Sequence, residues 1–276
     1  MDYWYIWLPS ALLILFAVYL FLIAPRSKRA LSLPKFGYAH RGLWDADRPE
    51  NSLSAFQAAV DSGYGIEADV RLTRDGVAVM MHDNNLARVS GADGKVSELT
   101  YSELQEFRIG GKEKIPTLVE MLELVDGRVP LLIELKGETK DTSICDVVAP
   151  ILDSYKGEFV VESFNPVLLQ RMKKLRPEIR RGQLTSKLQH GEKKRTLAAI
   201  LFLMLTNLLS RPDFIAYRKG FSKNPSLVLI SWIFGVRRCV WTVKSLDEYN
   251  SLIARGDCPI FDSIPPEDRA RFQPLK

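Results

Sequence analysis

The stretch "GIEADVRLTRDGVAVMMHD" (residues 65–83) contains two short strand patterns joined by an Asp-Gly turn. Only residues 73–76 separate the patterns, whereas a crossover between parallel strands needs about a dozen residues. The stretch therefore predicts an antiparallel hairpin. Strand alternation places Glu67, Asp69 and His82 on one face, with Asp69 opposite His82 for a two-residue loop and Glu67 opposite it for a four-residue loop.

Two carboxylates on one face of a strand repel each other unless a cation lies between them. Their oxygens are hard ligands, which favour Ca²⁺ or Mg²⁺ over Zn²⁺. The alternative interpretation is a hairpin edge that faces solvent and carries scattered charges. The rest of the chain decides between these two interpretations.

Short apolar runs alternate with amphipathic segments along the remaining chain, a pattern typical of βα units around a parallel sheet. Without the return strand 77–83, eight strand candidates remain, which predicts an α/β fold, a TIM (β/α)₈ barrel with one antiparallel hairpin near its start. The eight candidates are residues 36–42, 65–72, 129–137, 158–164, 180–185, 213–217, 237–243 and 259–265.

The N-terminus carries an apolar run from Trp4 to Ala24 that contains no charged residue. Its length suits a bilayer core of about 30 Å, and basic residues follow it. A cleaved signal peptide is the alternative, but no basic residue precedes the run. We expect a transmembrane anchor at 1–25, a basic linker at 26–35 and a barrel domain at 36–276. The positive-inside bias predicts a single-pass membrane protein whose catalytic domain is cytoplasmic.

Composition excludes several classes of protein. The net charge of +5 is modest, and no stripe of Lys and Arg is interleaved with aromatic residues, so we expect no nucleic-acid partner. Three widely spaced cysteines without a CxxC pair argue against a disulfide framework. A second apolar segment, 197–209, is too short to span a bilayer and fits either a barrel helix or an interfacial helix. Nothing in the sequence defines the oligomeric state.

Polar residues gather at the predicted carboxyl ends of strands, which converge on one mouth in a barrel. His40 and Arg41 end the first strand, Glu134 and Lys136 end "LLIELKG", and Trp241 ends another. Taken singly, each histidine and the tryptophan fit a packed core as well. Together with the acidic hairpin they suit hydrolysis of a phosphate diester, because cations neutralise phosphate oxygens and two histidines transfer protons.

The ordered set "AHRG…PENSLSAF…GIEADVRLTRDGVAVMMHD…LLIELKG…VWTVK" resembles the glycerophosphodiester phosphodiesterase family. The likeness runs from about Phe36 to Pro265 and is densest in its first hundred residues. It implies a TIM barrel, a divalent cation (Mg²⁺ or Ca²⁺), and hydrolysis of glycerophosphodiesters to glycerol phosphate and an alcohol.

The same resemblance implies site roles for nine residues. They are His40 and His82 as the general acid and base, Glu67, Asp69 and Glu134 as metal ligands, Arg41 and Lys136 as phosphate contacts, Trp241 as a wall of the cleft, and Glu50 as an acid near the site. The last strand departs from the family pattern, since "GDCPIFDSIP" keeps only Asp262 of its final motif. This departure puts local detail there in doubt.

The leading hypothesis is a membrane-anchored, metal-dependent phosphodiesterase that acts on glycerophosphodiesters or, like a lysophospholipase D, on lysophospholipids. The nucleophile is either water or the glycerol 2-hydroxyl; the resemblance favours the hydroxyl, through a cyclic phosphate. Two alternatives stay open: a catalytically silent membrane module that binds phosphorylated head groups, and a phosphoinositide-type lyase that releases a cyclic phosphate.

Overall fold

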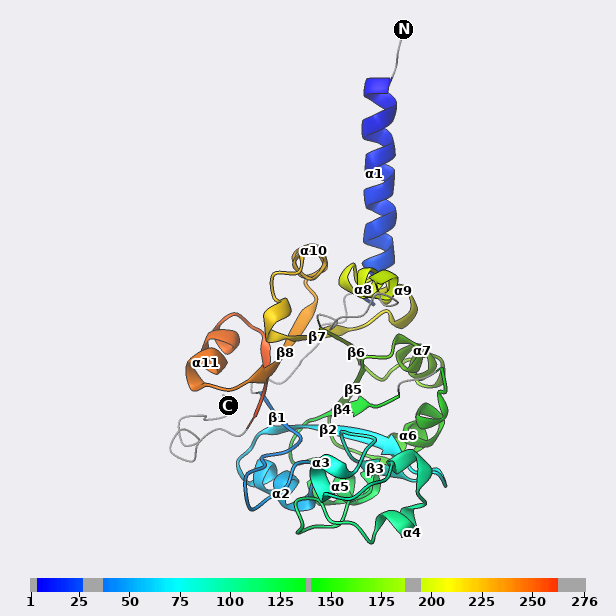
Figure 1. Cartoon of the computed structure of the whole chain (residues 1–276). Helices are drawn as coiled ribbons and strands as arrows, with labels where there is room; N and C mark the ends of the chain where they lie inside the picture. The colour runs from blue at the N-terminus through cyan, green and yellow to red at the C-terminus, as the bar shows by residue number, and fades with distance from the viewer. Residues whose placement is uncertain (1–3, 27–36, 138–139, 187–194, 263–276) are drawn as a thin grey trace.

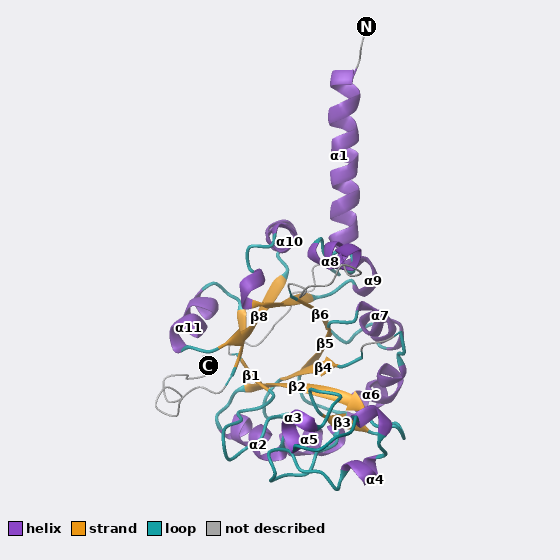
Figure 2. Cartoon of the chain, viewed as in Figure 1, coloured by secondary structure: helices purple, strands orange, loops and turns teal. Residues whose placement is uncertain are grey.

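A computed structural model describes residues 4–26, 37–137, 140–186 and 195–262 of the chain (Figure 1). Parallel strands form a closed ring, because β1 pairs with β9 on one side and with β2 on the other. Figure 2 shows this ring with helices around it. The prediction of a TIM barrel is confirmed. The ring consists of β1 (Tyr38–His40), β2 (Gly65–Leu72), β4 (Leu131–Leu135), β5 (Phe159–Ser163), β6 (Arg181–Thr185), β7 (Phe214–Arg218), β8 (Arg237–Val243) and β9 (Cys258–Phe261).

Except for α6, the longer helices around the ring begin at a cap side chain that accepts a first-turn N–H, a common helix start. Ser245, the cap predicted from the sequence, accepts from the main-chain N–H of Glu248. These helices are α2 (Leu53–Asp61), α5 (Leu118–Val125), α6 (Ser143–Ser154), α7 (Pro166–Leu175), α10 (Pro225–Phe234) and α11 (Leu246–Ala254). Shorter elements are α3 (Ala87–Ser90), η1 (Val96–Glu98), α4 (Tyr101–Leu104), α8 (Arg195–Phe202), α9 (Asn207–Ser210) and η3 (Lys219–Phe221).

The barrel interior near the amino ends of the strands is a packed apolar core. Tyr38, Leu132, Val160 and Phe214 are buried there, each contributed by a different strand. Gly182 on β6 leaves room for the Phe214 ring, because a Cβ atom at residue 182 would lie 2.2 Å from it. The barrel is therefore filled at this end, and its polar residues lie towards the carboxyl ends of the strands.

The predicted hairpin is present in part. Strand β3 (Ala78–Met80) pairs antiparallel with the end of β2, and Val70 faces Met80. This register differs from both registers expected from the sequence. Thr73 and Val77 close a loop of three residues, whereas the expected loops had two or four. The pairing ends at Met80, so a bend rather than strand alternation places His82.

The prediction of a membrane-spanning anchor is wrong. Helix α1 (Trp4–Ile23) contains Pro9, and its last turn packs on the barrel, where Ile23 is buried and Tyr19 and Leu20 contact the core. Over the described part of the chain, no helix has both the length and the apolarity that crossing a bilayer requires. The predicted single-pass membrane localisation, with its cytoplasmic orientation, is overturned by the same finding.

The apolar segment 197–209 forms two short helices rather than one. α8 ends at Phe202, and α9 follows after a turn at Met204, which has a φ of 56°. Helix α9 packs against α7 and α1, with Asn207 and Ser210 buried. Apart from Arg26, the predicted basic linker lies outside the described residues, as do residues 263–276 of the predicted barrel domain.

Candidate active site

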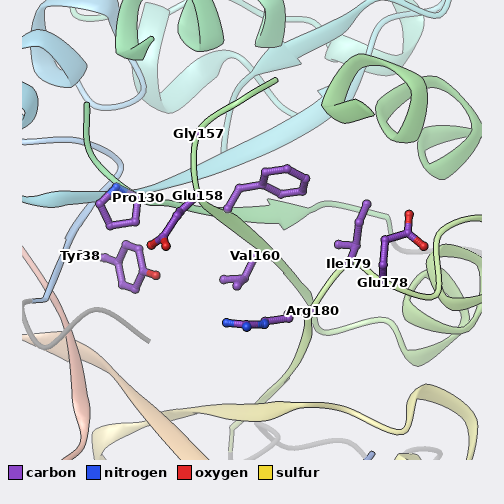
Figure 3. Close-up of a pocket in the computed structure, with 9 residues that line it drawn as sticks. Tyr38, Pro130, Gly157, Glu158, Val160, Glu178, Ile179 and Arg180 are labelled. Carbon is purple, nitrogen blue, oxygen red and sulfur yellow. The ribbon is translucent and has the colours of Figure 1, made fainter. Parts of the chain in front are cut away.

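A cavity of about 600 Å³ lies at the carboxyl ends of β2, β4 and β5, beside the segment that follows β3. Its lining includes His82, Glu134, Lys136 and Phe164. Another pocket, of about 320 Å³, lies at the opposite end of the barrel beside Glu158, which directly precedes β5 (Figure 3). Chemistry in TIM barrels takes place at the carboxyl ends of the strands, so the larger cavity is the candidate site.

Asp69 is fully buried and held by groups from three segments of the chain. The Asn51 amide donates to its Oδ2 at 2.9 Å, and its main-chain N–H donates back to Asn51 Oδ1 at 3.2 Å. Lys136 Nζ lies 3.0 Å from Oδ1, and Arg41 Nε lies 3.5 Å from Oδ2. Burial alone would raise the pKa of Asp69, but the charges of Lys136, His82 and Arg41 lower it below its usual range. Asp69 is therefore a permanent carboxylate.

Arg41 and Asn51 both have left-handed backbones, with φ values of 60° and 55°. Such conformations cost energy in residues other than glycine and often occur at functional sites. The Arg41 conformation points its main-chain N–H at Glu67 Oε2, at 3.0 Å. The strained backbone therefore ties the first strand to the acids of β2.

Lys136 bridges two acids, since its Nζ also lies 2.7 Å from Glu134 Oε2. Burial would lower the lysine pKa, but Asp69 and Glu134 raise it above its usual value. Burial raises the pKa of Glu134 to about 7, although the nearby Lys136 charge opposes the shift. Glu134 thus exchanges a proton near neutral pH when no cation is bound.

Three buried carboxylates converge deeper in the mouth. Glu67, Glu134 and Glu162 each offer an oxygen, and these oxygens lie within 4.8 Å of one another. Burial raises the pKa of Glu67 and of Glu162, and the neighbouring acids raise both further. Glu162 Oε2 is buried without a hydrogen-bond partner among the described residues. An all-carboxylate donor set with an unsatisfied oxygen fits a hard divalent cation.

Each predicted catalytic histidine has a carboxylate on its Nδ1 atom. His40 Nδ1 lies 2.7 Å from Asp262 Oδ1, and His82 Nδ1 lies 2.5 Å from Asp83 Oδ1. A carboxylate there favours the tautomer that carries its proton on Nδ1, which leaves Nε2 available for a substrate. Burial lowers the pKa of His82, with Lys136 and Arg41 adding to the shift and Asp69 opposing it.

Glu50 is neutralised by two arginines. Arg41 Nη1 donates to Glu50 Oε1 at 2.8 Å, and Arg88 donates to both carboxylate oxygens, at 2.6 and 2.9 Å. Burial would raise the pKa of Glu50, but Arg88 and Arg41 lower it. Glu50 therefore favours its ionised form and holds the Arg41 guanidinium.

Trp241 on β8 packs edge-on against Phe164, which lines the cavity. Their ring centroids are 5.7 Å apart, with an interplanar angle of 86°. The Trp241 Nε1 atom is buried and has no hydrogen-bond partner among the described residues. The indole N–H is thus free to donate to a ligand.

The structure brings all nine predicted residues to this mouth. It adds residues with no role assigned from the sequence, namely Asn51, Asp83, Arg88, Glu162, Phe164 and Asp262. For Glu162 a signal was present: it stands one residue before the end of its strand, as Glu134 does, and the two are in register.

Comparison with known proteins adds an independent finding. The model of the Glycerophosphoryl diester phosphodiesterase family matches residues 40–264. A glycerophosphodiester phosphodiesterase of Caldanaerobacter subterraneus is 35% identical, over 53% of this chain and 65% of the relative. Glycerophosphodiester phosphodiesterase 1 of Homo sapiens is 31% identical, over 60% of this chain and 55% of the relative. This chain thus spans less than two thirds of the length of these relatives.

Solved structures show the same fold. A glycerophosphodiester phosphodiesterase from Thermotoga maritima superposes with a TM-score of 0.64 and 28% identity, covering 82% of this chain and 93% of that structure. A phosphodiesterase from Oleispira antarctica, solved with the product sn-glycerol-3-phosphate, has a TM-score of 0.70 and 24% identity. It covers 85% of this chain and 95% of its own, and at this identity it supports the fold alone.

Proposed function

The chain belongs to the glycerophosphoryl diester phosphodiesterase family, and on that premise we propose that it hydrolyses glycerophosphodiesters to glycerol phosphate and an alcohol. One observation carries the proposal: two imidazoles, each held by a carboxylate on Nδ1, border a mouth that also holds buried Lys136, Arg41 and acidic residues. A site that only bound phosphate would need the cations and not the two oriented histidines.

His82 acts as the general base in this proposal. Its lowered pKa favours the neutral imidazole, and Asp83 holds the ring so that Nε2 accepts the proton of the nucleophile. His40, held by Asp262, donates a proton to the leaving oxygen. Arg41 and Lys136 bind the phosphate oxygens, and Glu50 with Arg88 keeps the Arg41 guanidinium in place.

The proposed site holds a divalent cation on Glu67, Asp69 and Glu134. When bound, the cation supplies polarisation of the phosphoryl oxygen. The structural support is the buried cluster of Glu67, Glu134 and Glu162 with its unsatisfied oxygen; Asp69 is not a member of that cluster and pairs with Lys136. We propose Ca²⁺ or Mg²⁺ because the donor set consists of carboxylates.

The substrate is proposed to be a glycerophosphodiester with a small alcohol, such as glycerophosphocholine. A lysophospholipid is the second candidate, and exposed Phe164 beside Trp241 offers it an apolar wall at the mouth. Purified protein incubated with glycerophosphocholine or lysophosphatidylcholine, in Ca²⁺, Mg²⁺ or EDTA, tests both. Mass spectrometry of the products also detects any cyclic phosphate.

We expect glycerol phosphate and choline, with the reaction abolished by EDTA. Release of a cyclic phosphate as the final product would instead indicate a lyase. If the protein binds both substrates and converts neither, the silent binding module replaces this proposal.

A further inference from the structure

Glu162 is the one member of the buried acidic cluster that no motif in the sequence marks. It stands on β5, in register with Glu134 on β4, and only 1% of its surface is exposed. One of its carboxylate oxygens lies within 4.8 Å of oxygens of Glu67 and Glu134. Its side chain therefore points into the mouth of the barrel and not towards the surrounding helices.

One oxygen of Glu162 has no hydrogen-bond donor among the described residues. Glu134 has Lys136 at 2.7 Å, and Glu67 accepts the main-chain N–H of Arg41, but Oε2 of Glu162 has no hydrogen-bond partner. A buried carboxylate oxygen without a donor is unfavourable, so such groups occur where a ligand satisfies them.

The charges at the mouth give a second, independent reason. Glu67, Asp69, Glu134 and Glu162 are all buried, at 0–7% exposure. Within the described ranges, the lysine and arginine that face them are Lys136 and Arg41. Arg41 is shared with Glu50, which Arg88 also contacts, and His40 Nε2 lies 4.0 Å from Glu67 Oε2. With all four acids ionised and both histidines neutral, two negative charges remain unbalanced, which one divalent cation would offset. Without Glu162 only one negative charge would remain.

We propose that Glu162 is a further ligand of the divalent cation, added to the acids of β2 and β4 from the next strand of the barrel. The inference rests on the proposed function only in placing a cation at this mouth. It predicts that cation affinity, and not only turnover, depends on Glu162.

The test compares the full chain with two variants of equal charge change. Glu162→Gln keeps the size of the side chain and removes its charge. Glu158→Gln removes a charge from the same segment, immediately before β5, at the opposite end of the barrel (Figure 3). Isothermal titration calorimetry with Ca²⁺, Mg²⁺ and Mn²⁺ gives the affinities after removal of bound metal with EDTA.

E162Q should weaken cation binding at least about tenfold, whereas E158Q should leave it unchanged. The melting temperature of metal-free E162Q should equal or exceed that of the wild type, because the variant removes a buried acid whose neighbours are also acidic. Unchanged affinity in E162Q, or no binding of any of the three ions to the wild type, overturns the proposal. If E162Q does not fold, Glu162→Asp is measured in its place. A cation affinity of that variant equal to the wild-type affinity would also overturn the proposal.

Hydrolysis of glycerophosphocholine by the wild type is measured in parallel. An active wild type with unchanged binding in E162Q refutes the role of Glu162 alone. An inactive wild type whose cation affinity depends on Glu162 supports this ligand and refutes the proposed function.

Discussion

Glu134 makes the stability of the metal-free protein depend on pH in an unusual direction. Its pKa is raised from 4.5 to about 7 in the folded state, so at pH 5 the folded protein binds a proton there that the unfolded chain mostly lacks. Stability from this group therefore rises as the pH falls from 7 towards 4.5. One pKa unit corresponds to about 1.4 kcal/mol, and half of Glu134 is already protonated at pH 7. The free energy of unfolding should therefore increase by about 2 kcal/mol between pH 7 and pH 5.

Urea denaturation in EDTA at several pH values measures this gain. His82 acts oppositely over the same range, because its pKa is lowered, so the comparison that isolates Glu134 is wild type against Glu134→Gln. The difference in unfolding free energy should shift by about 2 kcal/mol in favour of the wild type from pH 7 to pH 5. A saturating divalent cation should remove the shift, since it competes with the proton. Parallel pH profiles for the two proteins would refute the reasoning.

The remaining predictions concern catalysis. His82→Ala and His40→Ala should each lower kcat on glycerophosphocholine by roughly 10²–10⁴-fold, and near-normal turnover would remove that histidine from the mechanism. Asp262→Ala should lower kcat by up to roughly 10⁴-fold with little change in KM, because Asp262 orients His40. A change in KM as large as the change in kcat would instead indicate a structural role for Asp262. The acid limb of kcat/KM should have its midpoint below about 6.5, because the pKa of His82 is lowered; a midpoint above this value would exclude His82 as the base.

Much of the barrel was predictable because strand periodicity is a local property of the sequence. The predicted bounds of β2 and β8 agree with the structure, and Asp-Gly correctly indicated a turn after β2. The hairpin register was not predictable, since it depends on how Thr73 and Val77 close the loop. The consequence is local: His82 reaches the site through a bend after Met80.

The candidate site was predictable where motifs mark it, and less so where partners meet only in the fold. Asp262 stands more than two hundred residues from His40 in the chain, so their hydrogen bond follows from closure of the barrel between β9 and β1. Glu162 had no motif around it, and only its alignment with Glu134 across two strands shows its place. The anchor prediction failed because no described helix combines the length and apolarity that a bilayer requires, and because the apolar run does not show that the last turn of α1 packs on protein.

Helix α1 is joined to the barrel by side chains that bind its final carbonyl groups. Asn207 donates to the carbonyl of Ile23, and Arg211 donates to those of Phe21 and Ala24. The helix extends away from the barrel from this joint (Figure 1). At 1.5 Å per residue, its far end lies about 30 Å along its axis from the joint. The anisotropy of a fluorophore placed near that end would therefore report how rigidly this joint couples the helix to the barrel.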